Sequence, residues 1–155
     1  MILITHAVVG AALSRITGNP MSSFMLAVVS HYILDAVPHY DYVDQDFVAN
    51  PRSRRSRMIF KFIMLDGVLG VFLPLWFFGW SDIFGFLNIF LAIVGAMLPD
   101  AFSGVHLYLP NRITPLLNRF HVGVHYLFIN KLYLQSFPIL GLFMQGLIIF
   151  IFLYN

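Results

Sequence analysis

Long, continuous apolar runs limit the folds that are open to this chain. The clearest run is residues 58–78, where Lys61 and Asp66 are the only charged residues. A run of about 20 apolar residues is long enough to cross the hydrocarbon core of a bilayer as a helix. Charged residues make up 10% of the chain, whereas soluble domains contain about 25%. The sequence therefore predicts an all-α integral membrane bundle, with residues 1–155 forming a single transmembrane domain.

Gly, Asn and Pro residues divide the chain into five principal expected helices. Gly18-Asn19-Pro20 is a strong turn signal, and it should join the first two helices as an antiparallel hairpin. Pro99 is expected to end or kink the fourth helix. The helices are expected at residues 2–16, 21–37, 58–78, 83–98 (or 83–102) and 137–153, with a shorter one at 116–131. Residues 38–57 and 103–119 are expected to be polar loops on one side of the membrane.

Basic residues set the expected orientation of the bundle. If the helices alternate in direction, Arg15 is the only basic residue on the side opposite the N-terminus, and the other eight share the N-terminal side. Positively charged loops are usually cytoplasmic. We therefore expect a protein of the bacterial inner-membrane type, with its N-terminus in the cytoplasm and its C-terminus on the other side. The net charge of +2 is too small to indicate nucleic-acid binding, and the absence of Cys excludes thiolate chemistry.

The end of the second expected helix holds the densest group of candidate metal ligands. His31 and Asp35 are four residues apart, so a helix places both on one face. Pro38 should stop the helix, and His39 and Asp41 follow in the loop. A lone His in an apolar helix is more often a hydrogen-bonded core residue. A cluster of ionisable groups in a membrane is costly and usually functional, which favours a metal site here.

Alternating helix directions bring further candidates to the same membrane face. His6 starts the first helix, Asp100 ends the fourth, and His121 and His125 follow it at a spacing of four residues. His6 and His31 lie at similar distances on either side of the hairpin turn, so we expect their rings to be partners across the two helices. The full set of expected metal ligands is His6, His31, Asp35, His39, Asp100, His121 and His125. Histidine and carboxylate ligands together suit zinc first, with manganese or iron as alternatives.

Four short motifs spread over most of the chain have this chemistry in common. They are His6 near the N-terminus, Ser30-His31-x-x-x-Asp35, Leu98-Pro99-Asp100 and His121-x-x-x-His125. Together they resemble the membrane-bound metal-dependent hydrolases, a family of small multi-helix inner-membrane proteins. The pattern of His31, Asp35 and His39 is also similar to the helical ligand motif of zinc-dependent phospholipase C. The resemblance implies hydrolysis of a lipid or phosphoester, whereas the residues by themselves indicate only a metal site.

The first functional hypothesis is a divalent-metal-dependent hydrolase that acts on a membrane lipid or a membrane-associated phosphoester at the cytoplasmic interface. Asp41 or Asp66 would serve as the general base. Arg112 or Arg119 would hold the substrate phosphate through bidentate hydrogen bonds.

Two other classes of function stay open at the level of sequence. A transition-metal transporter also uses His and Asp on membrane helices, but such sites usually lie near the bilayer midplane. The other class is a haem-binding or purely structural bundle, because paired His on facing helices can ligate haem. The helices at 58–78 and 137–153 are apolar on all sides, which fits either lipid contact or a homo-oligomer interface.

Overall fold

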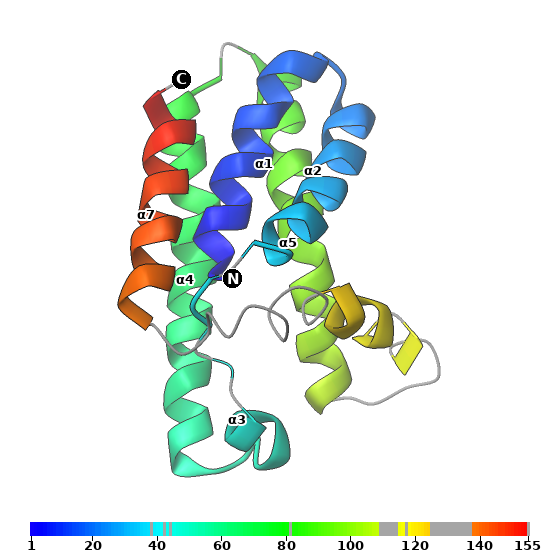
Figure 1. Ribbon diagram of the computed structural model, residues 1–155. Helices are drawn as coiled ribbons and strands as arrows, with labels where there is room; N and C mark the ends of the chain where they lie inside the picture. Colours follow the sequence, from blue (N-terminus) through cyan, green and yellow to red (C-terminus); the bar gives the residue numbers. More distant parts are fainter. Residues whose placement is uncertain are drawn as a thin grey trace.

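The computed structural model describes residues 1–37, 39–41, 43, 45–80, 82–108, 115–116, 118–124 and 138–154. The protein is helical throughout its regular elements in this part of the chain (Figure 1). The long helices are α1 (Leu3–Thr17), α2 (Pro20–Asp35), α4 (Arg54–Phe78), α5 (Ile83–Tyr108) and α7 (Pro138–Tyr154). A short helix, α3 (Gln45–Ala49), precedes α4, and residues 118–124 are also helical. The predicted all-α fold and its five principal helices are confirmed in these ranges.

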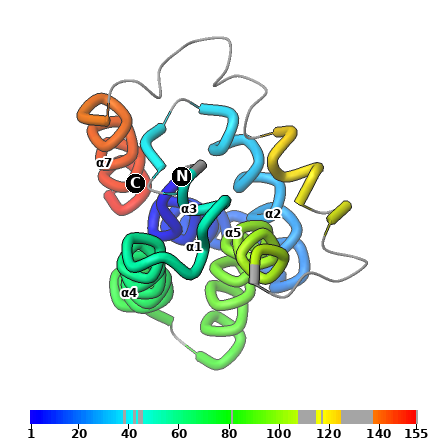
Figure 2. Tube along the Cα trace, turned by 90° about the horizontal axis from the view of Figure 1, so that it is seen from below, coloured from blue at the N-terminus to red at the C-terminus, as the bar shows by residue number. Residues whose placement is uncertain are grey.

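Helix α1 is the central element of the bundle. Viewed along the helix axes, it lies inside a ring formed by α2, α4, α5 and α7 (Figure 2). Most of its side chains are buried, and many are small. A Cβ added at Gly10 would lie 2.8 Å from Ala96 Cβ and 3.3 Å from Ala27 Cβ. Small residues therefore allow α1, α2 and α5 to meet at this level with their backbones close together.

The predicted hairpin between the first two helices is confirmed. Gly18 closes α1 with a left-handed backbone (φ of 58°), which glycine adopts without steric cost. The Asn19 side chain accepts hydrogen bonds from the Met21 and Ser22 N–H groups, and Pro20 begins α2. The chain then reverses direction, so the start of α1 and the end of α2 lie at the same end of the bundle (Figure 1).

A polar network joins the hairpin to α5 at the opposite end of the bundle. Ser23 Oγ donates to Asn88 Oδ1 (2.6 Å), and Asn88 Nδ2 donates to the Ser14 carbonyl (2.8 Å). Thr17 Oγ1 also hydrogen-bonds Ser23 Oγ. These groups satisfy one another in surroundings where water has little access. They fix the position of α5 along the α1–α2 hairpin.

Two helix boundaries differ from the prediction, and both differences shorten the expected loops. Helix α4 begins at Arg54 instead of residue 58, because the Ser53 side chain caps the helix by accepting from the Ser56 N–H at 3.0 Å. Helix α5 continues through Pro99 to Tyr108. A proline within a helix removes one hydrogen bond without ending the helix when neighbouring helices support it. Asp100 thus lies inside a helix and not at its end.

Large apolar side chains cover much of the outer surface. Phe72 and Trp76 on α4 and Ile139 on α7 are among the most exposed, at 67%, 86% and 85%. Two described helices, Arg54–Phe78 and Ile83–Leu107, are long and apolar enough to cross a membrane. Large exposed apolar patches are uncommon in soluble monomers, and exposed side chains of this size fit helices that contact lipid.

Candidate metal centre

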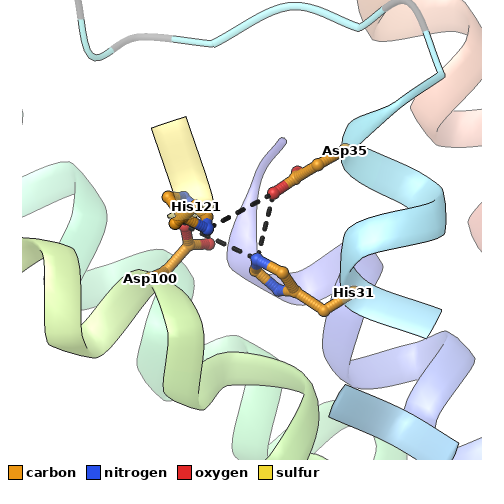
Figure 3. A group of neighbouring side chains, drawn as sticks. All are labelled: His31, Asp35, Asp100 and His121. Atoms are coloured by element: carbon orange, nitrogen blue, oxygen red, sulfur yellow. Dashed lines mark ion pairs between the residues drawn. The ribbon is translucent and has the colours of Figure 1, made fainter. Parts of the chain in front are cut away.

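Four ionisable side chains converge from three separate parts of the chain. His31 and Asp35 lie on α2, Asp100 on α5, and His121 on the helical segment 118–124 (Figure 3). One ligand atom from each lies within 4.8 Å of all the others. Ligand atoms around a tetrahedral zinc ion are about 3.3 Å apart, given Zn–N bonds of about 2.0 Å. A contraction of roughly 1.5 Å or less would therefore let these four residues hold a metal ion.

The hydrogen bonding of His31 leaves one ring nitrogen directed at carboxylates. His31 Nδ1 lies 2.7 Å from the Ala96 carbonyl oxygen, which can only accept, so Nδ1 carries a hydrogen. In a neutral ring, Nε2 then presents a lone pair. That atom is buried without a hydrogen bond, 3.0 Å from Asp35 Oδ2 and 4.0 Å from Asp100 Oδ1. Acceptors this close need a proton or a metal cation between them.

His121 is the fourth member of the group and lies next to Asp100 on α5. His121 Nε2 lies 3.2 Å from Asp100 Oδ1, and His121 Nδ1 lies 3.9 Å from Asp35 Oδ2. The imidazole therefore bridges the carboxylates of α2 and α5. Asp100 is the most exposed member, with 24% of its side chain accessible, against 1% for Asp35. The Asp100 side is thus the one from which a ligand or water could reach the group.

His6 lies directly beside this group. Its ring stacks on that of His31, with 4.0 Å between ring centroids and 25° between ring planes. The predicted pairing of these two rings across the hairpin is confirmed. His6 Nε2 lies 3.2 Å from Asp35 Oδ1, and neither His6 nitrogen makes a hydrogen bond. The close stacking leaves no space for a porphyrin between the two rings, which argues against this pair as haem ligands.

The first backbone N–H groups of α1 are held by side chains from other helices. Asp66 on α4 accepts from Leu3 N–H (2.6 Å, Oδ2) and Ile4 N–H (3.2 Å, Oδ1). Gln145 on α7 accepts from Ile2 N–H at 2.9 Å. A helix start without such partners would leave its donors unsatisfied. Asp66, one of the two residues that we expected as the general base, thus caps the start of α1 and positions His6 one turn later. Its role as a base stays a prediction.

Two further expected residues lie in the loop after α2. Gln145 Nε2 donates to the Tyr40 carbonyl at 2.9 Å and so ties this loop to α7. Asp41 Oδ2 lies 3.7 Å from the α-amino group of Met1, which also lies 3.3 Å from Asp35 Oδ1. His39 is buried with Nδ1 at 2.7 Å from the Val37 carbonyl. His39 is not a member of the four-residue group, and its role as a ligand stays a prediction.

The remaining expected residues are not placed at the group. His125 and Arg112 lie outside the described residues. Arg119 is exposed, and it is two residues from His121, a spacing that puts side chains on different helix faces.

The sequence did not lead us to Gln145, although a single amide in an otherwise apolar helix is itself a signal of a specific contact.

Comparison of the chain with models of known protein families, with curated proteins and with solved structures finds no match. The chemistry of the side chains at this site is therefore the basis for assigning a function.

Proposed function

We propose that this protein is an integral membrane bundle that binds a divalent metal ion at His31, Asp35, Asp100 and His121. The observation that carries the proposal is the environment of His31. Its Nδ1–H donates to a main-chain carbonyl, and its Nε2 lone pair is directed at two carboxylates. Metal-binding histidines typically have this arrangement, because the second-shell acceptor fixes the tautomer and orients the ring.

Charge balance also supports a bound cation. Among the described residues, the Met1 ammonium group lies beside the carboxylates of Asp35 and Asp41, and the carboxylate of Asp100 lies beside His31 and His121. With neutral imidazoles, these three carboxylates and one ammonium group, taken from the described residues, sum to a charge of −2 in a largely buried site. Uncompensated buried charge is strongly unfavourable. One divalent cation would balance the cluster, and two His with two carboxylates form a donor set suited to zinc, with manganese and iron as alternatives.

The membrane setting is supported by the length of α4 and α5 and by their exposed apolar side chains. In this setting, ionisable groups inside a bundle usually serve a function. The opposite end of the bundle carries the neutral network of Ser14, Thr17, Ser23 and Asn88. Within the described residues, no second group of metal-binding side chains lies there, which favours a reaction site over a transport path.

For the reaction we propose metal-dependent hydrolysis of a phosphoester, either in a lipid or in another membrane-associated molecule. A divalent metal, when bound, polarises a phosphoryl oxygen and makes a water molecule more acidic. The partly exposed Asp100 side gives a substrate a way to the site. Asp41 remains our candidate for the general base, because its carboxylate lies at the edge of the cluster.

Metal content tests the binding part of this proposal. We expect the protein, purified in detergent, to contain a divalent metal that is removed by a chelator and restored by Zn²⁺. His31→Gln should lose this metal, whereas His106→Gln, a matched change on α5 outside the group, should keep it. A wild-type protein that neither contains nor binds a divalent metal would refute the proposal.

Activity tests the reaction separately. We expect the metal-loaded protein to release phosphate or head group from phospholipid vesicles, and the chelated protein to be inactive. Wild-type protein that binds metal but hydrolyses neither phospholipids nor a soluble aryl phosphate would refute the hydrolase assignment and leave the metal centre in place.

A further inference from the structure

The carboxylate of Asp35 has a histidine on each of its two oxygens. His31 Nε2 lies 3.0 Å from Oδ2, and His6 Nε2 lies 3.2 Å from Oδ1. The four-residue group uses the Oδ2 side, where His121 Nδ1 also lies at 3.9 Å. The Oδ1 side therefore presents a second, separate set of donors.

His6 itself points to a ligand on that second side. The side chain is fully buried, and neither ring nitrogen makes a hydrogen bond. An imidazole without a hydrogen-bond partner is costly in a buried site. Its Nε2 is the atom nearest Asp35 Oδ1, so a cation at this point would satisfy both groups at once.

A positive charge already occupies this side in the structure. The Met1 α-amino group lies 3.3 Å from Asp35 Oδ1 and 3.7 Å from Asp41 Oδ2. Carboxylates from α2 and from the following loop thus converge on a common cation position. A divalent ion bound to Asp35 Oδ1 on this side would have His6 Nε2 and Asp41 Oδ2 as its nearest further donors, a set common in zinc and manganese sites.

We propose a second divalent metal site formed by His6, Asp35 and Asp41, with Asp35 bridging two metal ions and the Met1 amine displaced. In this two-metal state Asp41 is a metal ligand and no longer the general base. The inference rests on the proposed metal centre at His31. The stacked rings of His6 and His31 support it, because their centroids are 4.0 Å apart and each ring faces a different oxygen of one carboxylate. Two-metal hydrolytic sites hold their ions about 3.5–4 Å apart.

The two-metal arrangement also specifies the substrate class more closely. Two divalent ions would bring four positive charges to the three carboxylates of Asp35, Asp41 and Asp100. Counted over these described groups alone, that leaves one excess positive charge. An anionic phosphate group would balance that charge and could bridge both ions. A neutral ester would leave it uncompensated, so this site selects phosphoesters over carboxylic esters.

Manganese is the probe for this proposal, because paired and isolated Mn²⁺ ions differ in their paramagnetic resonance spectra. We expect the chelated full-length protein in detergent to bind two Mn²⁺ ions per chain and to give the spectrum of an exchange-coupled pair. His6→Gln should bind one ion and show the spectrum of an isolated ion. Asp41→Asn, a change in a loop, should do the same if His6→Gln fails to fold, and His106→Gln should retain the coupled pair.

The outcomes separate this inference from the proposal on which it rests. One ion in the wild-type protein, or two ions that His6→Gln leaves in place, would overturn the second site and preserve the first. Loss of the only bound ion in His6→Gln would assign His6 to the first site, and would also overturn the second. No bound ion in the wild-type protein would overturn both proposals.

Discussion

Replacing Asp66 should destabilise the bundle far more than replacing a carboxylate that caps a helix in water. Asp66 is 8% exposed and accepts two backbone hydrogen bonds at the start of α1. A hydrogen bond to a charged group contributes about 1.5–3 kcal/mol. Asp66→Ala removes both acceptors and leaves two donors in apolar surroundings. We therefore expect the free energy of unfolding to fall by roughly 3–5 kcal/mol.

Asp82 provides a matched control for this experiment. Its Oδ1 accepts from the Gly85 N–H at 2.8 Å at the start of α5, but the residue is exposed, so water can replace the carboxylate. Asp82→Ala should cost about 1 kcal/mol. Asp66→Asn keeps one acceptor oxygen and should fall between the two. Chemical unfolding of metal-free protein in detergent measures these values without a contribution from bound metal.

Two results would refute this reasoning in different ways. If Asp66→Ala lowers stability no more than Asp82→Ala, the two hydrogen bonds do not hold the start of α1. If Asp66→Asn keeps stability and metal content but loses hydrolysis, Asp66 acts as the general base that the sequence suggested.

Two more changes test how the site is held in place. Gly141→Ala should lower the free energy of unfolding by about 1–3 kcal/mol and weaken metal binding, because the new Cβ would lie 2.4 Å from Tyr40 N. Gly146→Ala is the control, since its Cβ would meet nothing within 4 Å. Equal stabilities of the two variants would contradict the packing of α7 on the loop that holds Tyr40. Asn88→Ala should cost about 1–3 kcal/mol in the same assay while metal content stays unchanged. Loss of metal in Asn88→Ala without loss of stability would contradict the separation of the two ends of the bundle.

The sequence predicted those features of the site that depend on local spacing. His31 and Asp35 meet because they are four residues apart on one helix, and His6 meets His31 because both are similarly distant from a clear turn signal. Helix direction alone also predicted that Asp100 and His121 lie at the same end of the bundle, although it did not predict their contact.

The contacts that the sequence did not predict depend on how helices are shifted along one another. Asp66 reaches α1 because Gly70, one turn later, allows close packing: a Cβ there would lie 3.3 Å from Ile4 Cα. Gln145 similarly reaches the start of α1 from a helix distant in sequence. Periodicity gives the face of a helix but not its axial position, so neither role could be read from the residues alone.

The unequal lengths of the helices have a consequence for the surrounding lipid. Helix α1 has 15 residues and α4 has 25, which correspond to about 22 Å and 37 Å, and α4 and α5 extend past the metal-binding end of α1 (Figure 1). In the proposed membrane setting, a hydrocarbon core about 30 Å thick matches the long helices but not the short ones. The bilayer beside α2, a helix of 16 residues, must then thin locally to match the shorter helix. Bilayer thickness would thereby control how readily the proposed phosphoester substrate reaches His31 and Asp100.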